Sequence, residues 1–438
     1  MGKQFIRDSI GSVIALTVVA LSGIAWNLLT GRLLGPTGVG VLAIVILCPT
    51  LAFSLGGMTF GLGTVYQLGS KKHSRDSLIT NSLLVGVVAG VILYITFAVT
   101  APLFAASLYR GVPLGYLCLS FTAVIFHLVL YQLGSVLQGM GRIGSHNVLG
   151  ASRHLVSLIS LLALMLLIRA GIMEATVSFV AGAVVSCLLC LYYVKRVSGF
   201  HWSPDLSLLW KTLSISGKLH LATVATLLYS QIGLLVANYY LSSQEVGFLF
   251  IALAGFQLLS ALPRAAQTVL YPRTASETEE EAVQSVETTC RNTVFWTVVM
   301  ALGLVVFGRW GIRMLLGEQF YPSLVPLWIL LPGAVMSVAA QVSSALWIRM
   351  QWYWFMAASG IGIAVVGIVL QFVLVPVYGV QGSAWASSLT YLLGFLIVAT
   401  VYYLRVNKRI WQLFLLQRSD VAVYWRLCQQ VVRRVANG

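Results

Sequence analysis

The chain contains a series of long apolar segments from which charged residues are almost absent, and this pattern constrains its fold more than any other feature. A helix needs about 20 apolar residues to cross the roughly 30 Å hydrocarbon core of a bilayer. Of the 438 residues, 59% are hydrophobic and only 9% are charged, too few charges to cover a globular protein of this size. The segments do not show the alternating polarity of barrel strands. The sequence therefore predicts an all-α polytopic membrane protein.

Twelve segments are long and apolar enough to be spans: 10–31, 38–62, 79–104, 114–138, 147–168, 175–194, 216–240, 246–271, 289–308, 322–347, 354–376 and 381–404. If both termini are cytoplasmic, 22 of the 27 basic residues fall on the cytoplasmic side and 5 on the outer side. Cytoplasmic loops of membrane proteins carry an excess of Lys and Arg. This bias supports the twelve-span count and the orientation together.

An internal repeat divides the chain into two halves. The segment Leu34 to Ile44, which begins in the polar turn Gly31 to Gly40, aligns with Leu241 to Ile251 at an offset of 207 residues. A second alignment sets Gly171 over Gly379 at an offset of 208. Many transporters are built from such repeats. We therefore expect two six-helix lobes that both begin on the cytoplasmic side and are related by a pseudo-twofold axis along the membrane normal.

The spans and the charge pattern give four segments. Residues 1–195 form the predicted N-lobe with spans one to six, and residues 216–404 the C-lobe with spans seven to twelve. Between them, residues 196–215 are predicted as a cytoplasmic linker with an interfacial helix. Residues 405–438 alternate apolar and basic residues at helical spacing. We expect this basic amphipathic cytoplasmic tail to lie against anionic lipid.

Several function classes find no support in the sequence. Nucleotide-binding, zinc-protease and serine-hydrolase motifs do not occur, and the histidines lack metal-ligand spacing. Despite a net charge of +15, the basic residues are spread over loop ends instead of forming a nucleic-acid-binding stripe. All twelve acidic residues map to span ends and loops. The chain is therefore predicted to be no enzyme, to need no metal or other cofactor, and to lack a mid-span carboxylate that could carry a coupling ion.

Arg264 is the leading candidate for a functional charge. It lies eight residues, about 12 Å of helix, before Pro272 at the inner end of its span. A charge at that depth is costly unless it faces a wet cavity or a partner. The preceding Pro263 frees a backbone carbonyl, which also favours an interior position. We interpret Arg264 as a cavity-lining anion contact, and snorkelling to the inner interface is the alternative.

Four further cationic positions could serve the same cavity. Lys218 and His220 begin span seven, which runs antiparallel to the span of Arg264. Arg153 with its neighbour His154, and Arg349, are assigned to the inner ends of spans five and ten. Ordinary anchoring at the inner interface is the alternative role for each of them.

Two polar residues lie in the middle of predicted spans. Gln231 could contact a ligand or hydrogen-bond to a neighbouring helix. His127 could act as a proton-relay group, although a packing histidine with a satisfied hydrogen bond is the simpler interpretation.

Five motifs in the expected order resemble a known family. They are GRLLGPTGVG after span one, SSQEVGFLFIA after span seven, LYPRTAS at the end of span eight, LLGEQFYPS before span ten and VYGVQGSAWASS entering span twelve. Over about residues 5–404 the chain resembles the Wzx-type polysaccharide transporters, a branch of the multidrug/oligosaccharidyl-lipid/polysaccharide exporter (MOP) superfamily with a MATE-like fold. Many members carry an Asp near the position of Gln231, and this chain does not.

The resemblance implies a function. Such proteins flip polyprenyl-pyrophosphate-linked oligosaccharide repeat units from the cytoplasmic to the outer leaflet for assembly of O-antigen, capsule or exopolysaccharide. The resemblance implies a multi-pass protein of the inner membrane, alternating access coupled to a gradient of H⁺ or Na⁺, and contact with membrane lipids and polysaccharide polymerase or assembly proteins. Since both lobes lie in one chain, a monomer is sufficient. Because this chain has Gln231 near the position where many members carry an Asp, the resemblance does not decide whether ion coupling occurs at that position.

The charged residues agree with such a substrate. Arg153, Lys218, Arg264 and Arg349 would capture pyrophosphate near the inner mouth. Arg32, at the outer end of span one, would assist release or anchor lipid head groups. The main alternative is an ion-coupled small-molecule exporter of the multidrug type, although the sequence lacks the interior carboxylates that a cationic drug would need. A glycan ligase or polymerase is a third class, which the short outer loops disfavour.

Overall fold

The computed structural model describes residues 2–57, 60–69, 73–168, 171–199, 201–406, 410–415, 417 and 420. Over these residues the backbone is helical and no strand occurs. The elements are α1 (Gly2–Gly57), α2 (Phe60–Gly69), α3 (Arg75–Phe104), α4 (Leu114–Gly139), α5 (Ile143–Leu167), α6 (Ile172–Ser198), α7 (Leu206–Tyr240), α8 (Ser243–Ser276), α9 (Glu279–Leu315), η1 (Glu318–Ser323), α10 (Leu324–Arg349), α11 (Tyr353–Val401), η2 (Tyr402–Val406) and η3 (Ile410–Leu413). Within the described residues, nine helices are long and apolar enough to cross a membrane. The chain is a multi-pass membrane protein.

Two of these helices are much longer than one span requires. The apolar part of α1, Thr17–Gly57, has 41 residues, and Trp354–Val406 has 53 residues. Each contains one glycine with a non-helical backbone: Gly35 has φ 63° and ψ −178°, and Gly379 has φ 59° and ψ −135°. Glycine adopts positive φ without the steric penalty of a Cβ atom. Both breaks fall between predicted spans, while the total of twelve spans stays a prediction.

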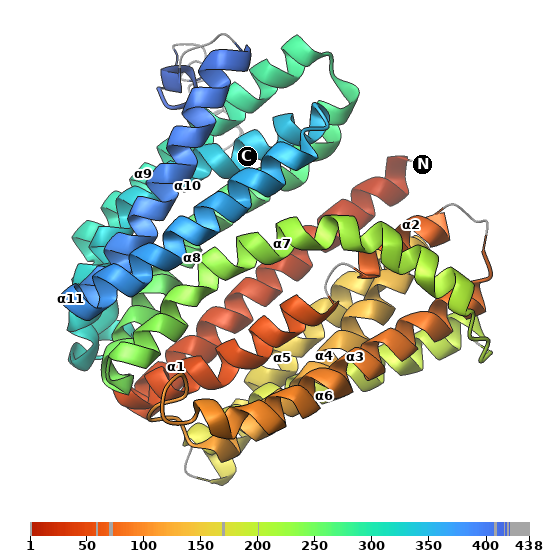
Figure 1. Ribbon diagram of the computed structural model, residues 1–438, viewed down its shortest axis with the longest axis horizontal. Helices are drawn as coiled ribbons and strands as arrows, with labels where there is room; N and C mark the ends of the chain where they lie inside the picture. Colours follow the sequence, from red (N-terminus) through yellow and green to blue (C-terminus); the bar gives the residue numbers. More distant parts are fainter. Residues whose placement is uncertain are drawn as a thin grey trace, which may run out of the picture. The chain divides into compact units, whose positions relative to one another are not determined.

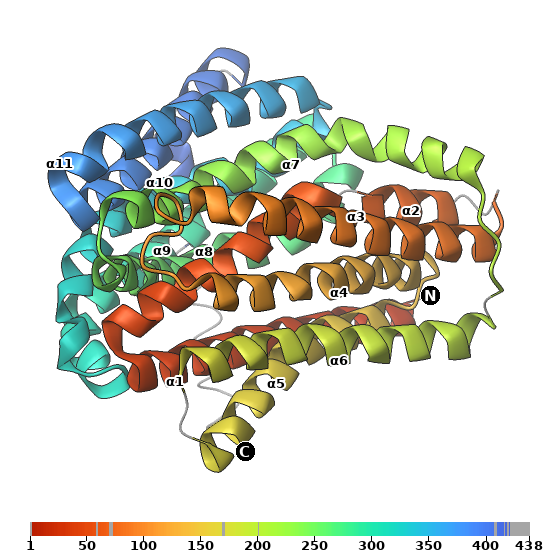
Figure 2. The ribbon, with the colours of Figure 1, turned by 60° about the horizontal axis from the view of Figure 1, so that its bottom comes forward.

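The chain divides into two compact units. Unit 1 comprises residues 1–250 and 314–320, and unit 2 comprises residues 251–313 and 321–438. In unit 1, α4 packs between α3 and α6, and α5 packs against α6 and α1 (Figure 2). In unit 2, α10 packs along α11 (Figure 1). The predicted lobe boundaries and the pseudo-twofold axis stay predictions.

Parts of the predicted linker and tail belong to described elements. Residues 206–215 form the first turns of α7, and the Asp205 side chain caps this helix by accepting the Leu208 N–H at 2.9 Å. The linker as an interfacial segment stays a prediction. In the tail, Leu413 is fully buried in an apolar cluster of unit 2 that includes Tyr402. The tail beyond Asp420 lies outside the described residues, and its lipid contact stays a prediction.

The two aligned turns meet each other inside unit 1. A Cβ atom added to Gly40 would lie 1.7 Å from the carbonyl oxygen of Ser243. A Cβ atom added to Gly247 would lie 2.0 Å from the carbonyl oxygen of Pro36. The numbers of the two glycines differ by 207, and so do those of the two carbonyl residues, which is the offset of the sequence repeat. The same backbone approach is therefore made twice, once from each copy of the repeat.

Candidate functional site

Arg153 lies in the middle of α5 and not at its end. The helix begins at Ile143, so Arg153 follows ten residues, or about 15 Å, later. The helix thus begins four residues before predicted span five, and the assignment of Arg153 and His154 to the inner end of that span stays a prediction. The polar residues before them belong to the helix because they find partners: His146 Nδ1 lies 2.9 Å from the Gly134 carbonyl, and Ser145 donates to Tyr193 Oη at 2.6 Å.

The guanidinium of Arg153 lies between two imidazoles. Its NH1 group is 3.3 Å from Nε2 of His127 on α4, and its NH2 group is 2.9 Å from Nε2 of His154 on α5. His127 is 4% exposed, whereas Arg153 and His154 are partly buried. All three residues are candidates from the sequence alone, which does not indicate that they lie together. Arg153 and His154 thus form the partly exposed side of the cluster, and His127 forms its buried side.

Aromatic rings complete the surroundings of His127. Phe53 of α1 and Phe179 of α6 make edge contacts with the imidazole, with ring centroids 5.9 and 5.4 Å away. Among the described residues, no carboxylate forms an ion pair with Arg153. A partly buried charge is costly when it lacks a counter-ion. The positive charge of Arg153 is therefore left without a carboxylate counter-ion among the described residues.

Three further predicted site residues of unit 1, His220, Gln231 and Lys218, belong to α7. Nε2 of His220 lies 2.9 Å from the carbonyl oxygen of Leu55. Gln231 is partly buried in α7. The side chain of Lys218 falls outside the described part of the chain, although its backbone belongs to α7. Their roles in substrate contact stay predictions.

Arg32 is exposed and donates to the carbonyl oxygen of Met314 at 2.8 Å. Met314 lies in the last turn of α9, where carbonyl groups lack intrahelical partners. The structure thus gives Arg32 a capping role within unit 1. Its predicted part in substrate release stays a prediction.

The two candidate arginines of unit 2 make backbone contacts. Arg264 is exposed on α8, and its guanidinium donates to the Ser260 carbonyl at 3.0 Å and to the Gln257 side chain at 3.0 Å. Arg349 is partly buried and donates to the Glu277 carbonyl at 2.8 Å, where it holds the connection between α8 and α9. Arg264 therefore presents an exposed cation on unit 2, while Arg349 has a structural partner.

Unit 2 also contains two buried polar pairs that no sequence pattern indicated. Arg291 of α9 forms a two-point ion pair with Asp420, at 2.8 and 3.3 Å, and both side chains are about 5% exposed or less. Tyr402 donates a hydrogen bond to Glu287, and both residues are buried. These residues are 129 and 115 positions apart in the sequence. Both pairs are structural, because their charges and hydroxyl groups are already engaged.

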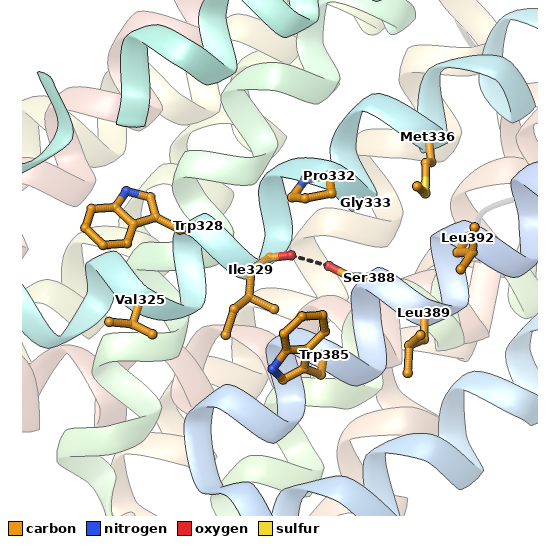
Figure 3. Close-up of a pocket in the computed structure, with 10 residues that line it drawn as sticks. All are labelled: Val325, Trp328, Ile329, Pro332, Gly333, Met336, Trp385, Ser388, Leu389 and Leu392. Carbon is orange, nitrogen blue, oxygen red and sulfur yellow. Dashed lines mark hydrogen bonds between the residues drawn. The ribbon is translucent and has the colours of Figure 1, made fainter. Parts of the chain in front are cut away.

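An apolar cavity of about 390 Å³ opens between α10 and α11 in unit 2 (Figure 3). Trp328 and Trp385 line it, and neither charged nor titratable side chains are among its lining residues. The Ser388 hydroxyl, the one side-chain hydroxyl in the lining, donates to the Ile329 carbonyl at 2.6 Å. The cavity therefore offers almost only hydrocarbon contacts.

Comparisons with solved structures place the fold. The chain is similar to the lipid II flippase MurJ in an inward closed conformation, with 14% identity, coverage of 92% of this chain and 89% of MurJ, and a TM-score of 0.78. It is similar to an inward-facing multidrug resistance MATE transporter of the MOP superfamily, with 15% identity, coverage of 89% and 97%, and a TM-score of 0.72. A MOP superfamily transporter from Pyrococcus furiosus has 16% identity, coverage of 90% and 94%, and a TM-score of 0.58. The chain therefore has a MATE-like and MurJ-like fold.

Sequence comparison gives the family. No protein of curated function matches the chain at a significant level. Residues 29–326 match the family described as polysaccharide biosynthesis protein, and this match covers well over half of the chain. The chain belongs to the polysaccharide biosynthesis protein family, as a multi-pass membrane protein whose solved structural relatives are flippases and transporters.

Proposed function

We propose that the protein is a flippase that moves polyprenyl-pyrophosphate-linked oligosaccharide repeat units from the cytoplasmic to the outer leaflet for cell-surface polysaccharide assembly. Its family and its MurJ-like fold support a membrane flippase or transporter. The observation that carries the proposal furthest is the Arg153 guanidinium in the middle of α5, which has no carboxylate partner among the described residues. A pyrophosphate head group would supply the missing counter-charge through charge-assisted hydrogen bonds.

The proposed transport cycle is alternating access through a cationic central cavity. Arg153 and the exposed Arg264 provide charges for the head group, while Lys218, His220, Arg349, Gln231 and Arg32 remain candidates for the same path. The protein would lie in the inner membrane with both termini cytoplasmic, and a gradient of H⁺ or Na⁺ would drive transport. Membrane lipids and polysaccharide polymerase or assembly proteins would be its partners, and a monomer would be sufficient.

A leaflet-sidedness assay tests the proposal. Purified protein in proteoliposomes should move a polyprenyl-pyrophosphate-linked oligosaccharide between leaflets. Arg153→Gln and Arg264→Ala should each slow this movement at least about tenfold, which corresponds to the loss of one charge-assisted hydrogen bond. Arg75→Gln, at the exposed start of α3, is the matched control and should leave flipping unchanged. Equal flipping by all three variants would remove both arginines from the mechanism.

An ion-coupled exporter of small molecules is the second candidate, because the fold is shared with multidrug resistance MATE transporters. The buried carboxylates that the structure describes in unit 2 argue against such an exporter. Asp420 is paired with Arg291, and Glu287 accepts from Tyr402, so neither is available to a cationic drug. A melting temperature that rises with dye cations, and not with polyprenyl pyrophosphates, would favour the exporter.

A further inference from the structure

The hydrogen bonds of Arg153 define the protonation of both histidines. A guanidinium has five donors and no acceptor. The Nε2 atoms of His127 and His154, which lie 3.3 and 2.9 Å from it, must therefore accept its hydrogen bonds. An imidazole that accepts at Nε2 carries its proton on Nδ1 and is neutral. The cluster as observed thus has one positive charge, on Arg153, and two neutral imidazoles.

Protonation of either imidazole would change this arrangement. A proton on Nε2 converts the acceptor into a donor, so the hydrogen bond to Arg153 is lost and two positive charges face each other at about 3 Å. Histidine is the side chain whose charge ordinarily changes between about pH 5 and pH 8. The cluster can therefore accept a proton near neutral pH only when a negative charge arrives to separate the cations.

The surroundings that the structure describes do not supply that negative charge. The helices α1, α2, α3, α5 and α6 all pack on α4, which carries His127. From α5 the facing groups are Arg153 and His154, and from α1 and α6 they are the rings of Phe53 and Phe179. The described hydrogen bonds and ring contacts of His127 include none with a side chain of α2 or α3. The neutralising group must come from a ligand.

We propose that Arg153, His127 and His154 form an oxyanion site that takes up a proton together with its anion. A tetrahedral oxyanion has several acceptor oxygens, so it can receive hydrogen bonds from the guanidinium and from a protonated imidazole at once. Arg153 and His154 are partly exposed, which gives the anion access. The proton then strengthens binding of the anion, and the anion strengthens binding of the proton by the same factor. This inference rests on the proposed function for the identity of the anion, the pyrophosphate of a lipid-linked glycan.

The site also bears on where a proton could bind within the spans. All twelve acidic residues map to span ends and loops, and Gln231 stands near a position where similar proteins carry an Asp. A mid-membrane carboxylate is then not available as the proton carrier. The two imidazoles lie in the middle of α4 and α5 and would hold the proton beside the bound anion; this uptake is a property of anion binding and is separate from the H⁺ or Na⁺ gradient proposed to drive transport.

Calorimetric titration of the purified full-length protein with inorganic pyrophosphate tests the inference. Titrations in two buffers with different ionisation enthalpies give the number of protons taken up per anion. The doubly substituted protein His127→Gln/His154→Gln keeps an acceptor beside Arg153 but cannot be protonated, so it corrects for the protonation of pyrophosphate itself. The wild-type protein should take up more protons than this variant, and its affinity should rise by up to about tenfold per pH unit for each additional proton as the pH falls from about 8 to about 6.

Four further variants complete the test. Arg153→Gln should abolish pyrophosphate binding at every pH, and each single His→Gln variant should show intermediate proton uptake. His146→Gln should behave like the wild type, because His146 lies elsewhere on α5 and its ring bonds to the Gly134 carbonyl of α4. Equal proton uptake by the wild-type protein and the doubly substituted protein would overturn the inference, and so would normal binding by Arg153→Gln. A melting temperature close to that of the wild type shows that each variant is folded.

The outcome separates this inference from the proposed function. If the wild-type protein flips lipid-linked glycan but binds pyrophosphate without extra proton uptake, the proton-linked site is wrong and the flippase stands. If pyrophosphate binding is proton-linked but no glycan crosses the bilayer of proteoliposomes, the site stands and the flippase is wrong.

Discussion

The buried ion pair between Arg291 and Asp420 gives a sharp prediction for the stability of the tail segment. Both carboxylate oxygens of Asp420 accept from the guanidinium, which also donates to the Gln412 carbonyl at 3.0 Å and to Thr288 at 3.3 Å. Removing one member of a buried pair leaves the other charge uncompensated and costs about 3–5 kcal/mol. We therefore expect Asp420→Ala to release the segment around residues 410–420 from α9.

Hydrogen exchange measures this release directly. The amides of Phe414 and Leu415 both donate to the Trp411 carbonyl, at 3.0 and 2.9 Å, and should be protected in the wild-type protein. In Asp420→Ala, a loss of 3–5 kcal/mol should accelerate their exchange by at least about a hundredfold. The double variant Arg291→Met/Asp420→Leu removes both charges and should exchange much more slowly than the single variant, because a well-packed apolar pair replaces a buried ion pair at little cost.

The same pair predicts a pH dependence. Burial alone would raise the pKa of Asp420, but hydrogen bonds from Arg291 and the Gln417 N–H, together with the guanidinium charge, outweigh burial and hold this pKa below its ordinary value. A carboxyl whose pKa is depressed by folding stabilises the folded state above its unfolded pKa of about 3.9 and loses that effect as the pH falls further. Protection should therefore persist from pH 8 to 5 and fall below about pH 4. Exchange in Asp420→Ala within about twofold of the wild-type rate would refute the reasoning.

Two further substitutions should affect stability in predictable ways. Gly40→Ala places a Cβ atom 1.7 Å from the Ser243 carbonyl oxygen and should lower the free energy of unfolding by about 1–3 kcal/mol, whereas Gly23→Ala, with open space around it, should not destabilise the protein; thermal melts in detergent compare them. Tyr402→Phe removes the hydroxyl that donates to buried Glu287 and should cost about 1–3 kcal/mol, and a melting temperature equal to that of the wild type would contradict this prediction.

The fold class was predictable because it follows from composition along the chain. Apolar segments of span length can be satisfied in a bilayer only as helices or closed barrels, so the structure could hardly have been otherwise. Helix ends were less predictable. The start of α5 at Ile143 depends on partners from other helices for Ser145 and His146, and those partners cannot be seen in the local sequence.

The candidate site was predictable only in its parts. Arg153, His154 and His127 are polar residues within apolar segments of the sequence, and this pattern identifies them as candidates without a structure. Their meeting depends on the packing of α4 against α5, which brings together residues 26 positions apart. The pair of Arg291 and Asp420 was missed for a related reason: its members are 129 positions apart, and each looked like an ordinary loop charge.

The reciprocal contact of the glycine turns connects the sequence repeat to packing. Gly40 approaches Ser243, and Gly247 approaches Pro36, so one kind of contact is made twice with the two copies exchanged. A reciprocal contact of this kind, in which residue i contacts j and the equivalent of j contacts the equivalent of i, is what the predicted pseudo-twofold axis would require. Any side chain at either glycine would strike a backbone carbonyl, which cannot move aside as a flexible side chain can. A small residue is therefore required in both copies for one packing reason, and this explains why glycine stands at both aligned positions of an otherwise weak repeat.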